Sequence, residues 1–158
     1  MKKNEIAAAL AALKEIKLTK IEDKDFRNLI IDDHFILLDV GRKVDAKVED
    51  SRKVFLEAHK ADEKAVNELN TKIAEALTRE EKVAFARELR EKHKDYLDAV
   101  KAFNDKVDSF YAEEVTGLKP IDREKFIEEM KKMDEFKLSW VEALYPLFVL
   151  EEAKPKKK

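Results

Sequence analysis

Cysteine is absent from this sequence, and glycine and proline are scarce, with two and three residues among 158. Without cysteine the chain cannot form disulfide bonds, thiolate metal sites or cysteine nucleophiles. Phosphate-binding loops need several glycines, and sheet proteins with many tight turns need more glycine and proline than this chain has. These absences favour a helical protein and remove several common classes of enzyme.

The charges show no large excess of either sign. Charged residues make up 43% of the chain, hydrophobic residues make up 44%, and the formal net charge is −2. Acidic and basic residues alternate closely from Arg79 to Lys101, whereas nucleic-acid binding usually requires a concentrated positive surface. We therefore expect no nucleic-acid-binding face on the folded part of the protein.

A short basic tail closes the sequence at residues 154–158. We interpret it as a disordered, solvated end that aids solubility. The alternative is a direct role of the tail on nucleic acid or on anionic lipid.

The hydrophobic spacing predicts an all-α protein, built as a long antiparallel helical hairpin that is similar to a coiled coil and carries an end-cap of short helices. We expect a single domain over residues 1–153, because the chain has the length of one ordinary domain. Its predicted parts are an N-terminal helix and linker at 4–22, the hairpin at 23–112, and the C-terminal cap at 113–153.

Two apolar stripes predict the hairpin. In the first arm, apolar residues recur every three or four positions over residues 26–77, as one very long helix or as two helices with a break near residues 59–62. Thr78 and Glu81 form a capping box, which predicts the start of the return arm. The stripe of the return arm runs over residues 83–110 without a break.

Such a hairpin is too thin to cover both sides of its own apolar seam. The distal part, around residues 66–86, is expected to pack against a second copy or to protrude as a two-helix arm. A homo-oligomer is therefore one expectation for this chain.

Three residues have the type and position of helix N-caps. Asp23 precedes the first arm, and Asp122 precedes a short helix that ends at Met133. Ser139 begins a second capping box, so the closing helix is expected to start at Trp140.

The segment between the hairpin and the short helix, residues 113–122, contains a glycine and a proline and is expected to be extended. It could pair with residues 16–21 or with residues 135–138. The sequence thus allows a minor two-stranded β element.

The densest apolar run of the chain ends at residue 150, just before the basic tail. It is about half as long as the ~20 residues that span a bilayer, and a helix that is apolar all round is usually buried on several sides. The interpretation we favour is that this run fills the protein's own core. The alternatives are an interfacial membrane helix and a partner-binding patch made of Trp140, Leu144, Tyr145, Leu147 and Phe148.

The sequence gives no signature of a catalytic or metal site. The residues three positions before His34, His59 and His93 are isoleucine, leucine and arginine, whereas a di-iron bundle site would have glutamate there. None of the serines lies in a glycine-flanked elbow. We expect a protein that is not an enzyme and that binds no metal and no cofactor.

Asp33 is the one charged residue that we single out. It occupies a stripe position between Ile30 and Leu37, where a core residue is expected. Either it meets a cation from another helix, or it is a buried polar residue that fixes the register of the packing.

The order of segments resembles a family of small helical phage and prophage proteins of unknown function. The resemblance lies in IAAALAALKEIKLTKIEDKDFRNLI, FYAEEVTGLKPID and FKLSWVEALYPLF, which match the family's N-terminal AL-x-x-L helix, extended Glu-Val segment and final Leu-Ser helix. It covers nearly the whole chain in layout. It implies a phage or prophage origin, a role near virion assembly, and no catalytic residues.

Together these observations predict a non-enzymatic protein–protein interaction or assembly protein, with other virion or assembly subunits as partners. The alternative function is a small regulator that binds a host protein or nucleic acid through its basic tail. The start MKKNEIAAALAALKEIK is better described as an amphipathic helix than as a signal peptide, because Glu5 and Glu15 flank a short apolar stretch. We expect the protein in the host cytoplasm or in the virion, and not in a membrane.

Overall fold

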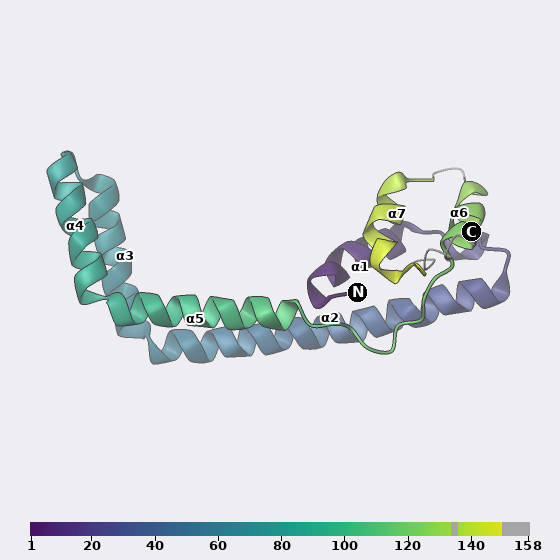
Figure 1. Ribbon diagram of the computed structural model, residues 1–158, viewed down its shortest axis with the longest axis horizontal. Helices are drawn as coiled ribbons and strands as arrows, with labels where there is room; N and C mark the ends of the chain where they lie inside the picture. Colours follow the sequence, from purple (N-terminus) through teal and green to yellow (C-terminus); the bar gives the residue numbers. More distant parts are fainter. Residues whose placement is uncertain (134–135, 150–158) are drawn as a thin grey trace, which may run out of the picture. The chain divides into compact units, whose positions relative to one another are not determined.

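The computed structural model describes residues 1–133 and 136–149 (Figure 1). Within these ranges the regular elements are α-helices and short 3₁₀ helices, without a β-strand. The prediction of an all-α protein is confirmed. The predicted basic tail at 154–158 lies outside the described residues, as does the end of the predicted C-terminal cap.

In the described ranges the elements follow one another as seven α-helices and three 3₁₀ turns. They are η1 (Lys3–Glu5), α1 (Ile6–Glu15), η2 (Leu18–Lys20), α2 (Lys24–Ala58), α3 (Lys60–Glu75), α4 (Arg79–Lys92), α5 (Lys94–Tyr111), α6 (Arg123–Lys131), α7 (Leu138–Leu144) and η3 (Tyr145–Leu147).

Contacts between residues divide the chain into two compact units. Unit 1 consists of Met1–Val44 together with the chain from Tyr111 onward, and unit 2 is Asp45–Phe110. The sequence predicts one domain over residues 1–153, whereas the structure has two units with helix α2 contributing to both.

Unit 1 is built around one hydrophobic core. The core side chains come from α1, the first part of α2, α6, α7 and the segments that join them. Helix α1 packs against α7. It also lies close to α2 at Gly41, where an added Cβ would be 3.3 Å from Cγ2 of Ile6. Gly41 therefore sits inside a continuous helix because the neighbouring helix needs the space.

The segment that enters unit 1 after α5 is extended, as expected. It turns at Gly117, whose φ of +87° favours glycine. The N–H of Val115 donates to the carbonyl of Met1 (2.9 Å), and the N–H of Ile121 donates to the carbonyl of Leu147 (2.8 Å). The segment is thus fixed at both ends by backbone hydrogen bonds.

The predicted partners of this segment differ from the observed ones. Pairing with residues 16–21 is wrong, because the chain forms the 3₁₀ turn η2 there. Pairing with 135–138 falls partly outside the described residues, and Leu138 already belongs to α7. In the described part of the chain the β element is limited to the isolated bridges Lys2–Glu114 and Ile121–Phe148.

The predicted N-caps are confirmed at three helices. The Oδ1 atom of Asp23 accepts from the N–H of Phe26 (2.9 Å) at the start of α2. Thr78 Oγ1 accepts from the N–H of Glu81 (3.2 Å), and the Glu81 carboxylate accepts from the N–H of Thr78 (3.1 Å). Asp122 accepts from the N–H of Lys125 (2.9 Å) at the start of α6.

The predicted capping box at Ser139 is wrong. Helix α7 begins at Leu138, and its N-cap residue is Lys137, which makes no side-chain capping bond. The N–H of Trp140 donates to the carbonyl of Lys137 (3.1 Å), so the chain is already turning before Ser139 can act as a cap.

Unit 2 contains the end of α2 and the helices α3, α4 and α5, with α3 and α4 packed as an antiparallel pair. The first arm is two helices, because α2 ends at Ala58 and His59 leaves the helical conformation (φ −116°, ψ 18°). The return arm is also interrupted, at His93 (φ −115°, ψ 24°), where the sequence predicts an unbroken helix.

Across residues 1–133 and 136–149, none of the helices combines the length and the apolarity needed to cross a membrane.

Candidate interaction surface

The predicted C-terminal patch lies mainly in the core of unit 1. Trp140 is only 3% exposed, and Leu144, Leu147 and Phe148 are buried as well. The interpretation of this run as part of the protein's own core is right for these four side chains. As a partner-binding patch the set is wrong, because buried side chains offer no surface; Tyr145, at 53%, is the exposed member.

Trp140 is fixed by a polar contact in addition to its packing. Its Nε1–H donates to Oε2 of Glu15 at 2.8 Å, and Lys137 Nζ lies 2.9 Å from the same oxygen. The hydrogen bond from Trp140, and then the ammonium of Lys137, hold the pKa of Glu15 below its ordinary value. The indole N–H is therefore satisfied inside unit 1, which is what a buried tryptophan requires.

Asp33 is fully buried at the side of α2 that faces the extended segment. Its Oδ1 atom accepts from the backbone N–H of Lys119 at 2.9 Å. The amino group of Lys119 bonds instead to Asp32 (2.9 Å), so Asp33 receives a backbone donor and not a helix-borne cation. Burial raises the pKa of Asp33 above its ordinary value. This carboxylate attaches the extended segment to α2.

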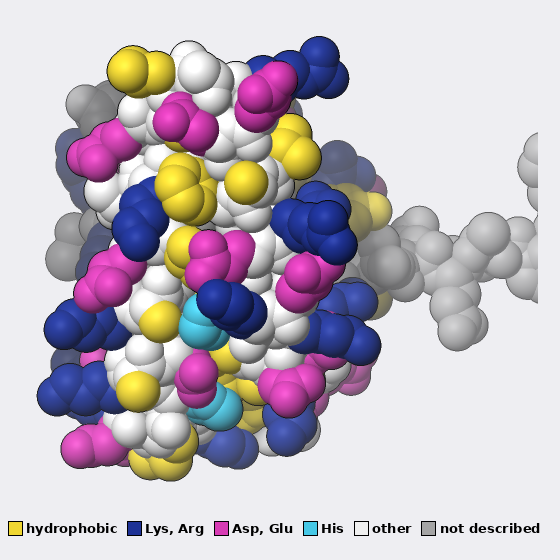
Figure 2. Space-filling view, turned by 90° about the vertical axis from the view of Figure 1, so that its left-hand side faces the viewer, with side chains coloured by type: hydrophobic (Ala, Val, Ile, Leu, Met, Phe, Trp, Pro, Cys, Tyr) yellow, Lys and Arg dark blue, Asp and Glu magenta, His cyan; other side chains and the backbone are white. Residues whose placement is uncertain are grey.

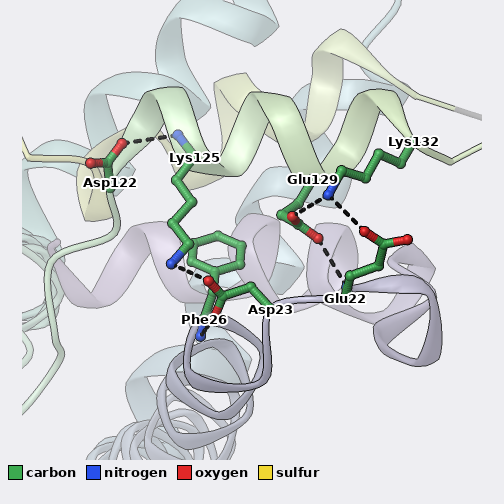
Figure 3. A network of polar contacts seen from close by, with 7 residues as sticks. All are labelled: Glu22, Asp23, Phe26, Asp122, Lys125, Glu129 and Lys132. Carbon is green, nitrogen blue, oxygen red and sulfur yellow. Dashed lines mark hydrogen bonds and ion pairs between the residues drawn. The ribbon is translucent and has the colours of Figure 1, made fainter.

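A second polar network joins α6 to the residues before α2 (Figure 3). The Glu129 carboxylate accepts from the N–H of Glu22 (3.0 Å) and from the amino group of Lys132 (2.6 Å). The amino group of Lys125 lies 2.6 Å from Asp23. The Lys132 ammonium is the main cause of a pKa for Glu129 below the usual range. These charged groups bond to one another and to backbone N–H groups, so their role is to join α6 to the start of α2.

The three histidines are divided between the units, with His34 in unit 1 and His59 and His93 in unit 2. His59 lies against the rings of Phe55 (4.6 Å between centroids) and Tyr96 (5.6 Å) in unit 2. His34 belongs to unit 1, and its ring is 6.4 Å from that of Phe35. Within the described ranges, no group of three or more His, Asp or Glu side chains is placed to hold a metal ion.

Unit 2 has an open, largely apolar groove between the end of α2 and α5, with a volume of about 740 Å³. Its floor includes Phe55 and Phe103, whose ring centroids are 4.7 Å apart. The groove is lined by Lys47, Val48, Asp50, Ser51, Val54, Phe55, Ala58, Phe103, Lys106, Val107 and Phe110. We call it the α2/α5 groove.

Two features of the α2/α5 groove are typical of an interaction surface. Val54 is 71% exposed although it stands beside the aromatic floor. Lys47 and Lys106 line the groove near Phe110, and Lys47 Nζ lies 4.3 Å from the centre of the Phe110 ring. An apolar floor with a few placed charges can bind an amphipathic surface.

A second hollow, of about 680 Å³, lies along α4 and is mainly charged. Only Val83 and Ala84 are apolar among its lining residues, the others being arginine, lysine and glutamate. On the face that α3 and α4 present, basic and acidic side chains are interleaved (Figure 2). Repeated charge alternation of this kind is typical of a solvated helix surface.

The sequence analysis missed the α2/α5 groove because it assigned the same residues to the inside of a hairpin. The spacing predicts an uncovered region at residues 66–86, where the structure buries Val66 and Leu69 but leaves Leu77 and Val83 exposed. The overlooked signal is Val54 beside Phe55, since two adjacent apolar residues make the stripe of α2 wider than one opposing helix can cover.

Comparison of the chain with protein-family models, with curated proteins and with solved structures finds no match. The resemblance to small phage and prophage proteins stays a prediction.

Proposed function

We propose that this protein is a non-enzymatic interaction protein that takes part in the assembly of a larger complex, and that the α2/α5 groove is its main contact surface. The observation that carries the proposal is the exposure of this groove. Phe55, Phe103 and Phe110 are only partly buried there, and Val54 is largely exposed. Aromatic side chains in an apolar depression are the kind of residues that dominate binding energy at protein interfaces.

The perturbed carboxylates of unit 1 support a non-enzymatic role. Asp33 and Glu129 are the buried acidic residues in the described chain, and both accept backbone N–H groups from neighbouring segments. Asp23 accepts from the first turn of α2 and from Lys125. Shifted pKa values often mark active sites, but structural networks cause them as well. Here the pKa values of Glu129 and Asp23 are lowered first by hydrogen bonds from lysines, and that of Asp33 is raised by its burial in the core of unit 1.

The proposal includes a phage or prophage origin, with virion or assembly subunits as the partners. Its support is the layout of segments that resembles the small helical phage proteins. The mixed surface charge of unit 2 also favours a protein partner over nucleic acid, because a strong basic patch is what phosphate contacts require (Figure 2).

The proposal is tested by deleting the gene in its phage or prophage and counting infectious particles. Wild-type protein supplied in trans should restore yield and particle morphology. Val54→Gln should restore them poorly, whereas Arg52→Gln, on the same helix but outside the groove lining, should restore them fully. An unchanged yield and morphology after deletion would refute a role in assembly.

A truncated protein without residues 154–158 separates the proposal from the regulator alternative. If the tail is dispensable, the groove proposal stands. Three results together would identify a nucleic-acid regulator instead: a requirement for the tail, full activity of Val54→Gln, and binding to DNA or RNA that weakens steeply with salt.

A further inference from the structure

We infer that the α2/α5 groove binds the α2/α5 groove of a second copy of this chain, so that the two helix pairs pack face to face as an antiparallel four-helix bundle. This inference rests on the proposed function and names the first partner of the groove. Two observations support it: the apolar side chains that stay exposed in the groove, and the positions of the charged residues along α2 and α5.

No second layer of helices covers the groove face of the α2/α5 pair in the described part of the chain. In the described part of α5, Tyr96 is the buried residue, while Phe103, Val107 and Phe110 face the groove with only partial burial. Two helices side by side bury one stripe each, and a stable helical core needs a further layer on the open face. A second copy provides an identical apolar face.

The charges along α2 suit pairing of the groove with itself. Lys47 lines the end of the groove near Phe110. Glu57 lies three residues after the lining residue Val54, and so falls on the same side of the helix at the opposite end. The ten positions from Lys47 to Glu57 correspond to a rise of about 15 Å. Along this side of the helix Lys47 stands at one end and Glu57, just outside the groove lining, at the other, with the lining residue Asp50 one turn from Lys47.

Helix α5 carries the same polarity. Lys106 lines the groove one turn before Phe110, and Asp95, eleven residues earlier, lies on the same side of the helix by its 3.6-residue period. The contacts of Lys47 with Phe110 and of Phe55 with Phe103 show that the two basic ends coincide. Both helices therefore have a groove lysine at one end and, beyond the lining at the other end, an acidic residue: Glu57 on α2 and Asp95 on α5.

Within the described chain these four charges have no oppositely charged partner, although the Lys47 ammonium lies over the Phe110 ring. Lys47, Glu57, Asp95 and Lys106 are exposed and form no ion pair among residues 1–133 and 136–149. They are available to a partner.

An isologous contact about a two-fold axis that crosses the helices places α2 on α2 and α5 on α5 of the second copy, in antiparallel directions. Lys47 then faces Glu57 of the second copy, and Lys106 faces Asp95 of the second copy. The midpoints of the two pairs agree to about one helical turn, which flexible lysine side chains can span. Each pair occurs twice, giving four interfacial contacts between opposite charges.

The other two-fold arrangement, with the axis along the helices, places α2 on α5 of the second copy at equal height. It would bring Lys47 against Lys106 and Glu57 against Asp95. Like charges opposed across an interface are unfavourable, so the charges select the antiparallel arrangement.

Sedimentation of the full-length chain over a concentration series tests the inference. The wild type should form dimers, and Lys47→Glu or Glu57→Lys should each raise the dissociation constant by about tenfold or more, because each puts like charges together twice. The double variant Lys47→Glu with Glu57→Lys should return the constant to near the wild-type value. Lys101→Glu, outside the groove lining, is the control and should change little.

The absence of cysteine gives a second, geometric readout. Ser51 lines the groove close to the midpoint between Lys47 and Glu57, so Ser51→Cys should form a disulfide with its own symmetry copy on mild oxidation. Ser109→Cys is the control, since in the antiparallel dimer the two copies of residue 109 are far apart. Strong cross-linking at residue 109 and none at residue 51 would overturn the arrangement.

A strictly monomeric protein at hundreds of micromolar, or a dimer that ignores the charge exchange, would refute self-pairing of the groove. The proposed function fails separately, in the particle assay. A monomer that still needs Val54 for particle assembly means that the groove holds a different protein, whereas a groove dimer without any assembly defect means that the function proposal is wrong.

Discussion

The two units of this chain differ in where their interactions come from. In unit 1, several ion pairs join segments that are far apart in sequence: Lys132 contacts Glu22, Lys137 contacts Glu15, and Lys119 contacts Asp32. Two further pairs of unit 1, Lys43–Asp39 and Lys132–Glu129, are local. In the described residues of unit 2, all ion pairs join residues three or four positions apart in sequence, as Arg87–Glu91 and Lys92–Glu88 do.

Burial follows the same division. Unit 1 holds the hydrophobic cluster of α1, α2, α6 and α7. The buried hydrophobic residues described in unit 2 are Val66, Leu69 and Tyr96, and α4 has none. Local pairs on exposed helices are worth about 0.3–0.5 kcal/mol each, whereas a buried large side chain contributes several times that amount. Unit 1 is therefore stabilised mainly by its core, and unit 2 mainly by contacts within helices and by the packing of its helix pairs.

The largest effect should come from Trp140 in unit 1. Trp140→Ala should lower the free energy of unfolding by about 3–5 kcal/mol, because it leaves a cavity and removes a donor from Glu15. Urea denaturation followed by circular dichroism measures the change, and in the wild type the indole should emit with a blue-shifted maximum. Tyr145→Ala, an exposed aromatic in the adjoining 3₁₀ turn, is the matched control and should cost less than about 1 kcal/mol. Equal losses from both variants would contradict the buried position of Trp140.

Asp33 should show the next largest effect. Asp33→Ala removes the acceptor of the Lys119 N–H, and an unsatisfied partly buried donor costs about 1–3 kcal/mol. Hydrogen exchange should show the loss of protection at Lys119 and in the extended segment of unit 1, with little change in unit 2.

Asp33 also predicts a pH dependence with a definite sign. Because burial raises the pKa of Asp33 in the folded protein, its stabilising contribution is complete below the unfolded pKa of about 3.9 and is lost as pH rises through the higher folded pKa. Asp33→Asn cannot ionise, so its stability relative to the wild type should increase with pH over this window. A constant difference between the two proteins would mean that the pKa of Asp33 is not raised.

The sequence predicted those features that depend on a few neighbouring residues. The caps at Asp23, Thr78 and Asp122 were recognisable because a capping side chain bonds the N–H two or three positions ahead of it. The break at His93 was not recognisable. The N–H of His93 still donates to Leu89 and its carbonyl still accepts from Leu97, so the apolar period continues across the break almost undisturbed.

The candidate surface was harder to predict, because the exposure of an apolar stripe depends on whether another helix, distant in sequence, packs over it. The apolar residues of α7 and those of α2 near Val54 look alike in sequence, yet α1 covers Trp140 whereas Val54 is left open. Asp33 was recognisable as unusual from its stripe position, but its partner is a backbone N–H 86 residues away, and no side-chain pattern reveals a backbone donor.

A smaller effect is expected from the capping box in unit 2. Thr78→Ala should destabilise by about 1 kcal/mol, since it leaves the N–H of Glu81 without its acceptor at the start of α4. The loss should stay within unit 2, where interactions are local, and hydrogen exchange should accelerate in α3 and α4 while α1 and α7 keep their protection. If α1 and α7 lose protection as well, the two units are not independently stabilised, and the contrast between them fails.

The smallest effect on stability should come from Val54, the residue whose exposure defines the α2/α5 groove. Because its side chain is 71% exposed, Val54→Gln should change the free energy of unfolding by less than about 0.5 kcal/mol when the protein is dilute enough to be monomeric. At high concentration the same change should destabilise the protein more, since a bound partner copy adds stability by mass action and the variant loses that contribution. Thermal melting at two concentrations at least a hundredfold apart measures both terms. The wild-type melting temperature should rise with concentration, and that of Val54→Gln should rise less. Equal rises would show that Val54 lies outside the dimer interface, and that the α2/α5 groove is not the surface that becomes buried on association.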